Sequence, residues 1–414
     1  MASHTTGTAL SEMLGEPDQT WLRARLEELE AIDRPSASEG ERRAAEWLVG
    51  RFRALGAEAR IEAAAAHGTY WWPLGIGAAL GALGGIAALR GRRLLGAALG
   101  ALGAAGIASD FPPHRRRLRA PLPKRTTYNV VCEIGDPDAA DAIVISAHHD
   151  AAHSGLVFHP AIPRIADRLG LIEPIETSPA LMAPVVGGPL LVALGALTKI
   201  RALTGAGTVL GLGSAAAMAE IGARRVVPGA NDNGTAVVSL LALARRLAES
   251  PAPGLRVILL SAGAEESFSE GMKAFGERHF AELPTESTFF LCLESTGSPH
   301  LLVLRGEGFL KMYDYPAPAL ELLDGAAEEL GIWLYPNLRL HNGTDGLEAL
   351  AAGYEAAVIA GCDDLKQPAN YHWPNDVAEN VDFATVADGI RLAEATIRRL
   401  AGRAARLRPP RAAV

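Results

Sequence analysis

The sequence predicts an α/β protein in three α/β/α layers, with a mixed, mostly parallel central sheet and two inserted apolar helical hairpins. Four short runs rich in Val, Ile, Leu and Phe are apolar nearly throughout, as strands are when helices cover both of their faces. These runs occupy residues 142–147, 256–261, 288–293 and 356–360. Helical patterns lie between them at 234–249 and 317–330, and such alternation of strand and helix is typical of parallel sheets.

The two ends of the chain add further elements to this sheet. Residues 36–55 open with serines suited to helix capping and continue with apolar residues on one helical face, until Gly56 ends the helix. Strands are predicted at 59–63 (ARIEA) and 127–134 (TYNVVCEI), on either side of the first apolar insertion. A final helix is predicted at about 383–401.

Composition excludes several classes of protein. The 414 residues include 39 basic and 47 acidic side chains, a net charge of -8, which argues against a nucleic-acid binder. A hydrophobic share of 49% excludes a disordered chain. Cys132, Cys292 and Cys362 lie in or beside apolar runs, so we expect reduced core thiols. The first sixty residues contain no apolar signal core, and both observations favour a reducing compartment.

The mean hydropathy of +0.13 with only 6% aromatic residues indicates a concentrated, non-aromatic apolar region. Four stretches without charge explain it, at 68–89, 94–109, 177–198 and 202–219. Three of them reach the length of about 20 residues that a membrane span needs, and a short basic turn joins each pair into a hairpin. Their glycines recur four residues apart, as in closely packed membrane helices. The alternative is two Ala/Gly-rich hairpins buried in the protein or in an oligomer interface.

Side chains that can bind metals follow the ends of the predicted strands and one predicted turn. They are His148, Asp150, Asp232, Glu265, Glu266, Glu294, Tyr371 and His372. Because sites in open α/β sheets form beyond the carboxyl ends of the strands, we expect these side chains to meet. Imidazole and carboxylate groups are ligands that zinc prefers.

In order and context, these residues resemble the co-catalytic di-zinc aminopeptidases. That family includes secreted bacterial aminopeptidases, folate-hydrolase-type carboxypeptidases and, as one-zinc relatives, the glutaminyl cyclases. The shared pattern is a His-x-Asp after a strand, a Gly-x-x-Asp turn, a Glu-Glu pair, a lone acid after the next strand and a late Tyr-His with a nearby Asp. The resemblance covers roughly 36–66, 126–151 and 226–402, and it implies a zinc-exopeptidase fold and a peptide substrate.

The resemblance also implies two zinc ions and their ligands. His148 and Glu294 would bind the first zinc, and Glu266 and His372 the second. Asp232 would bridge both.

Three further residues would act on this centre by the same resemblance. Asp150 would orient and polarise His148, Glu265 would be the general base, and Tyr371 would direct its hydroxyl at the transition state. Adjacent Glu265 and Glu266 can point in different directions at a strand end, so that one coordinates while the other stays free.

The chain departs from the family pattern in two places. Glu294 stands where the family usually has Asp, and a longer side chain is still an oxygen ligand. His149 is an extra imidazole, so either it or His148 is the ligand; the His-x-Asp spacing favours His148. His341 and Asp345 precede the last strand, where relatives often have an acid, and their role stays open.

The leading hypothesis is a zinc aminopeptidase that hydrolyses N-terminal peptide bonds through a water activated by two zinc ions. The alternatives are a one-zinc acyltransferase of the glutaminyl-cyclase type and a non-catalytic membrane scaffold on a hydrolase fold, and carboxypeptidase action is also open. The expected parts are a catalytic domain at 1–67, 110–176 and 220–402, hairpins at 68–109 and 177–219, and a basic tail at 403–414.

The hairpins predict an integral membrane protein. The second one separates His148 from Asp232, and two crossings would return both residues to the same side. Six basic residues flank the first hairpin on the domain side, and five lie in the two hairpin turns, which modestly favours a cytoplasmic domain. We expect no nucleic-acid partner, and a homo-oligomer is compatible with the sequence.

Overall fold

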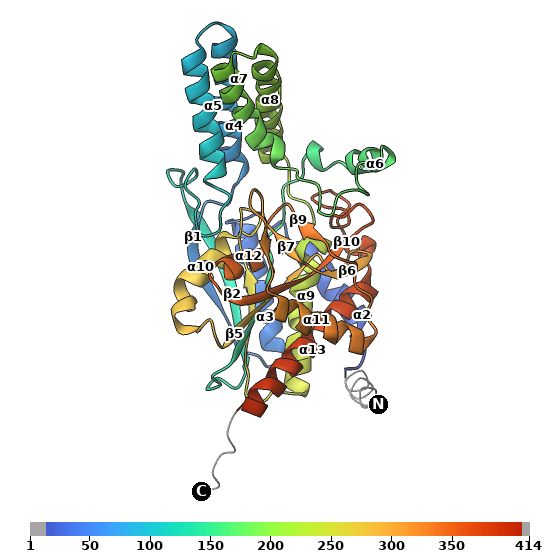
Figure 1. The fold of residues 1–414 in the computed structure, drawn as a ribbon. Helices are drawn as coiled ribbons and strands as arrows, with labels where there is room; N and C mark the ends of the chain where they lie inside the picture. The colour runs from blue at the N-terminus through green and yellow to red at the C-terminus, as the bar shows by residue number, and fades with distance from the viewer. Residues whose placement is uncertain (1–13, 408–414) are drawn as a thin grey trace.

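A seven-stranded mixed sheet lies at the centre of the computed structural model, which describes residues 14–407 (Figure 1). The strands are β1 (Ala59–Ala66), β2 (Arg125–Gly135), β3 (Ala142–His148), β4 (Arg256–Ala262), β5 (Thr288–Glu294), β6 (His300–Val303) and β10 (Glu355–Cys362). Their order is β1-β2-β4-β3-β5-β10-β6. The four strands β4, β3, β5 and β10 run parallel, and the remaining pairs are antiparallel.

Successive residues of the central strands face two separate cores. In β3, Ile143 and Ile145 lie in one core and Val144 lies in the other, as the period of two along a strand requires. The first core is covered by α2 (Gln19–Glu30), α3 (Glu39–Ala54), α9 (Thr235–Glu249), α11 (Ala317–Leu330) and α13 (Phe383–Leu407). The second is covered by α10 (Glu270–His279) and α12 (Asp345–Ala351). The predicted three layers are confirmed.

Several short elements are absent from the sequence prediction. Besides β6, they include a small sheet of β7 (Gly306–Glu307), β8 (Tyr313–Asp314) and β9 (Arg339–Leu340), and the helix α6 (Ala161–Arg168). The remaining single turns are η1 (Leu156–Phe158), η2 (Ala230–Gly234), η3 (Phe280–Glu282) and η4 (Ala378–Asn380). Two-residue strands are too short to show a period, which is why the sequence pattern does not predict them.

The last helix is longer than the predicted span of about 383–401 and includes the first residues of the predicted basic tail at 403–414. Helix α13 continues to Leu407, because Ala, Arg and Leu are strong helix formers and the first proline comes only after that point. The rest of the tail, and residues 1–13 of the predicted domain, lie outside the described residues.

The two apolar insertions form one four-helix bundle that projects from the sheet domain (Figure 1). The first hairpin consists of α4 (Trp71–Leu89) and α5 (Arg93–Ala108), and the second of α7 (Ala183–Thr198) and α8 (Arg201–Ala223). Helix α4 contacts the other three. Helices α4 and α8 are long and apolar enough to cross a membrane, and α5 and α7 are shorter.

Glycines allow the bundle helices to approach closely. A Cβ atom on Gly207 of α8 would lie 2.7 Å from the carbonyl oxygen of Gly188 and from the amide nitrogen of Val192, both in α7. A Cβ atom on Gly103 of α5 would lie 2.5 Å from the carbonyl oxygen of Gly77 in α4. These backbones therefore touch, as small residues permit between apolar helices.

The exposed apolar surface is concentrated in one part of the molecule. Within residues 14–403, all but three of the exposed large hydrophobic side chains belong to the bundle and its turns or to residues 156–175, which include α6. The exceptions are Ile61, Leu310 and Trp333. A soluble protein rarely exposes so continuous an apolar surface.

We expect Gly207→Ala to destabilise the protein, because the added methyl group would collide with the backbone of α7. Overpacking of this kind costs about 1–3 kcal/mol. Gly213→Ala, on the same helix, is the matched control: a Cβ atom added there would have no neighbour within 4 Å, and alanine favours the helix. Unfolding of both purified variants would be followed by circular dichroism. Equal stabilities would contradict the close packing.

Candidate metal centre

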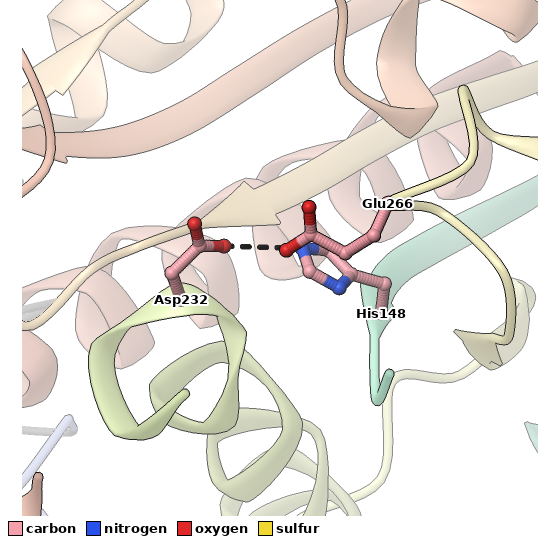
Figure 2. Close-up of side chains that lie close together, drawn as sticks. All are labelled: His148, Asp232 and Glu266. Atoms are coloured by element: carbon pink, nitrogen blue, oxygen red, sulfur yellow. Dashed lines mark ion pairs between the residues drawn. The ribbon is translucent and has the colours of Figure 1, made fainter. Parts of the chain in front are cut away.

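Parallel strands bring the predicted site residues to one edge of the sheet (Figure 2). His148 ends β3, Glu294 ends β5, and Glu265 and Glu266 lie in the loop after β4. Asp232 comes from the turn η2 at the start of α9. His372 and Tyr371 lie in the long segment after β10.

Asp232 lies between the two imidazoles. Its Oδ1 atom is 3.3 Å from Nε2 of His148, and its Oδ2 atom is 3.4 Å from Nε2 of His372. Both distances exceed the roughly 2.8 Å of a charge-assisted hydrogen bond. They match the edge of a tetrahedral zinc shell, about 3.3 Å for ligand bonds of about 2 Å. The two oxygens therefore face two separate positions, one beside each imidazole.

The first of these positions is bounded by His148 and Glu294. Nε2 of His148 lies 3.6 Å from Oε1 of Glu294. Nδ1 of His148 faces Asp150, at 3.2 Å from its carbonyl oxygen and 3.4 Å from Oδ1, so that Nε2 is the nitrogen directed at the carboxylates. His149 instead contacts the hydroxyl of Ser261 through Nδ1 at 2.9 Å, and it lies outside the cluster.

The second position is bounded by Glu266 and His372. Nε2 of His372 is 3.2 Å from Oε2 of Glu266. The other carboxylate oxygen of Glu266 is buried without a hydrogen-bond partner. Although burial favours the neutral imidazole, the charges of Glu266 and Asp232 raise the pKa of His372 to about 10. Donor atoms of His148, Asp232 and Glu266 all lie within 4.8 Å of one another.

Negative charge exceeds positive charge in this cluster. Burial raises the pKa values of Glu265, Glu266, Glu294 and Asp345, and repulsion from neighbouring carboxylates adds to the effect. Asp232 is the exception: burial opposes ionisation, but the two neighbouring imidazoles of His148 and His372 hold its pKa below the usual value. Buried carboxylates need cationic partners, so this donor set fits divalent metal ions such as zinc.

Two buried carboxylates, those of Asp150 and Asp376, hold the loops that carry the cluster by accepting hydrogen bonds from their backbone N–H groups. Asp150 accepts the backbone N–H groups of Glu265 and Glu266 and the hydroxyl of Ser36. In the same way, Asp376 accepts the N–H groups of Asn231 and Asp232 at 2.8 and 3.1 Å. Such contacts orient metal ligands in proteins.

Two further residues lie close to the cluster: Arg34, which the sequence does not indicate, and Asp345, whose role the sequence leaves open. The buried guanidinium of Arg34 donates to the carbonyl oxygens of Pro228 and Gly229, both at 2.6 Å, and so holds the turn before Asp232. Asp345 begins α12, is 1% exposed and has no hydrogen-bond partner for either carboxylate oxygen. The residues around Asp345 (HNGTDG, 341–346) are typical of a loop. No sequence pattern indicates that Arg34 supports the site.

A cavity that encloses about 750 Å³ of space, part of it open to solvent, borders Glu265, Glu266 and His372. Both insertions contribute to its wall: Tyr70 precedes α4, and Met182 precedes α7. The remaining wall includes Phe158, Phe268, Phe309 and Tyr371. The ring of Tyr371 stacks on that of His372, with centroids 3.8 Å apart.

The chain is similar to known proteins in part of its sequence and in its fold. Residues 216–397 match the model of peptidase family M28, a span that includes Asp232, the glutamates and His372 but not His148. No curated protein matches the sequence significantly.

Solved structures resemble nearly the whole chain at low identity. A zinc-dependent exopeptidase from Parabacteroides distasonis is 12% identical with a TM-score of 0.56, covering 93% of this chain and 99% of that one. The aminopeptidase from Aneurinibacillus sp. strain AM-1 is 13% identical with a TM-score of 0.53, covering 95% and 96%. Tannerella forsythia glutaminyl cyclase is 14% identical with a TM-score of 0.55, covering 93% and 99%. At these identities the likeness concerns the fold.

The family suspected from the motifs is thus confirmed, and so is the fold. The match lies on the part of the chain that supplies most of the buried donor cluster. Residues 216–397 carry a peptidase family M28 domain, the whole chain has the fold of the zinc exopeptidases, and together these findings support a zinc metallopeptidase.

Proposed function

We propose that the protein is a membrane-anchored aminopeptidase that uses two zinc ions to hydrolyse the N-terminal peptide bond of its substrate. The observation that carries this proposal is the position of Asp232, whose two carboxylate oxygens face two different histidines at 3.3 and 3.4 Å. A single metal ion would need only one of those positions. The presence of both His148 and Glu294 therefore favours two zinc ions over the one-zinc cyclase alternative.

The proposed ligands divide into two sets that share Asp232. His148 and Glu294 would complete the first site, and Glu266 and His372 the second. When bound, the zinc ions would polarise the scissile carbonyl and lower the pKa of a water molecule between them.

Glu265 is the proposed general base because it lies beside the cluster without facing a histidine as closely as the other carboxylates do. Its Oε2 atom is 3.8 Å from Nε2 of His148, and Ser269 donates a hydrogen bond to Oε1 at 3.3 Å. Burial raises the pKa of Glu265, which suits a group that accepts a proton from water and returns it to the leaving amine. The hydroxyl of Tyr371 would donate to the oxygen of the transition state.

The charge of the cavity favours an amino terminus over a carboxyl terminus. The described residues that line it include Glu265 and Glu266 but no lysine or arginine. A substrate carboxylate would therefore meet like charges without a cationic partner, whereas a terminal ammonium group would be attracted. This supports aminopeptidase rather than carboxypeptidase action.

The bundle is the proposed membrane anchor. All four of its helices carry exposed large hydrophobic side chains, and exposed basic residues lie in and beside its two turns. Trp72, 57% exposed, lies near its base, where aromatic side chains meet a membrane surface. The 19 residues of α4 span about 28 Å, close to the thickness of a bilayer core.

The side of the membrane on which the domain lies stays a prediction. Arg116 and Arg119, two of the six basic residues that flank the first hairpin, are engaged in ion pairs with Glu348 and Asp110. Charge therefore favours neither side clearly. All three cysteines are buried free thiols, and on that ground we propose a cytoplasmic domain.

The zinc content of the purified protein and the activity of a Glu265→Gln variant test the catalytic proposal together. We expect purified protein to contain two zinc ions per chain, to lose peptidase activity on chelation and to regain it with zinc. Glu265→Gln should keep both ions and lower kcat by about 10²–10⁴-fold, because it removes only the base. Elemental analysis measures the zinc content, and hydrolysis of aminoacyl substrates measures kcat. Full activity of Glu265→Gln would refute the assigned role, and Glu329→Gln, remote from the site, is the matched control.

A pair of lysine substitutions tests the membrane proposal. Leu102 on α5 is 61% exposed and Leu310 in the sheet domain is 57% exposed. In a bilayer, Leu102→Lys should cost about 2.5–3.5 kcal/mol and lower the yield of membrane-inserted protein, whereas Leu310→Lys should not. Carbonate-washed membranes and thermal unfolding in liposomes provide the readouts. Soluble wild-type protein, or equal behaviour of the two variants, would contradict the proposal.

A further inference from the structure

A second cavity lies beneath the helix α6. It encloses about 450 Å³ of space, part of it open to solvent, and its lining is apolar except for Gln367 and Tyr371. Ile162, Pro163 and Ala166 of α6 form one wall, and Ile172 lies on the same segment. This segment precedes the family match, which begins at residue 216, and it lies between two predicted ligands in sequence.

The second cavity adjoins the one at the metal cluster, and the two share part of their walls. Both are lined by Phe158, Pro179, Leu181, Gln367 and Tyr371. Phe158 lies edge-on to the ring of His372, with centroids 4.5 Å apart, and edge-on to that of Tyr371, at 5.6 Å. The partition between the two cavities therefore lies directly against a predicted zinc ligand, where the scissile bond must be placed.

We propose that the second cavity is a subsite for a large apolar side chain, and that the substrates are peptides whose first two residues are both large and apolar. This inference rests on the proposed aminopeptidase function. Consecutive side chains of an extended peptide point to opposite sides. A peptide bond held at the partition would therefore direct one side chain into each cavity.

The outer surface of α6 fits this substrate class. Ile165, Leu169 and Leu171 are 54%, 68% and 55% exposed, and the helix lies beside the base of the bundle (Figure 1). With the bundle in a bilayer, this apolar surface would meet the lipid boundary, where apolar peptide ends concentrate.

Filling the second cavity tests the inference. We expect the zinc-loaded wild-type enzyme to prefer Leu-Leu-Gly to Leu-Gly-Gly by at least about tenfold in kcat/KM, since burying a leucine side chain contributes about 1.5–3 kcal/mol. Ala166→Phe should lower this selectivity ratio toward one, because the ring would occupy the space of the second side chain. Ile165→Phe is the matched control, because it places the same ring on the exposed face of α6 and should keep the wild-type ratio.

The outcomes separate the inference from the function on which it rests. A wild-type ratio near one, or equal losses on both peptides in Ala166→Phe, would overturn the subsite while leaving aminopeptidase action intact. Zinc-loaded wild-type enzyme that cleaves neither peptide, nor any other aminoacyl substrate, would instead overturn the proposed function.

Discussion

The carboxylate of Asp150 is the constraint on which the site depends. It lies just beyond β3, yet it accepts the backbone N–H groups of Glu265 and Glu266 beyond the neighbouring strand β4. It also faces Nδ1 of His148, so one side chain fixes a histidine and the loop of two glutamates relative to each other. Burial opposes its charge, but the hydrogen bond and charge of His148 hold its pKa below the usual value, and it therefore stays an acceptor.

The same carboxylate joins the site to the N-terminal part of the chain. Ser36 donates to Asp150 at 2.6 Å, and the backbone N–H of Ala151 donates to the carbonyl oxygen of Arg34 at 2.9 Å. Arg34 in turn holds the turn that leads to Asp232. Buried carboxylates that outnumber the cations around them repel one another. The hydrogen bonds of Asp150 and Arg34 keep these carboxylates in place, so that metal ions can bind between them.

The sequence predicts the parts of the site that depend on strand order, and it misses those that depend on how the insertions fold. His148, Glu265 and Glu294 follow apolar runs, and parallel pairing alone brings such residues to one edge. Phe158 has no such signal, because its position against His372 depends on the path of the irregular segment between β3 and α6. The same is true of Arg34, whose two carbonyl partners lie nearly 200 residues away in sequence.

The bundle is attached to the catalytic loop itself. Arg119 donates to the carbonyl oxygen of Ser267 at 2.6 Å, and Arg116 donates to that of Phe268 at 2.7 Å. Both arginines follow the first hairpin, and at its start the ring of Tyr70 stacks on Phe268, with centroids 5.3 Å apart. Ser267 and Phe268 directly follow the Glu265-Glu266 pair. The first hairpin is therefore braced directly against the loop that carries the two glutamates, so the proposed membrane anchor also supports the geometry of the candidate site.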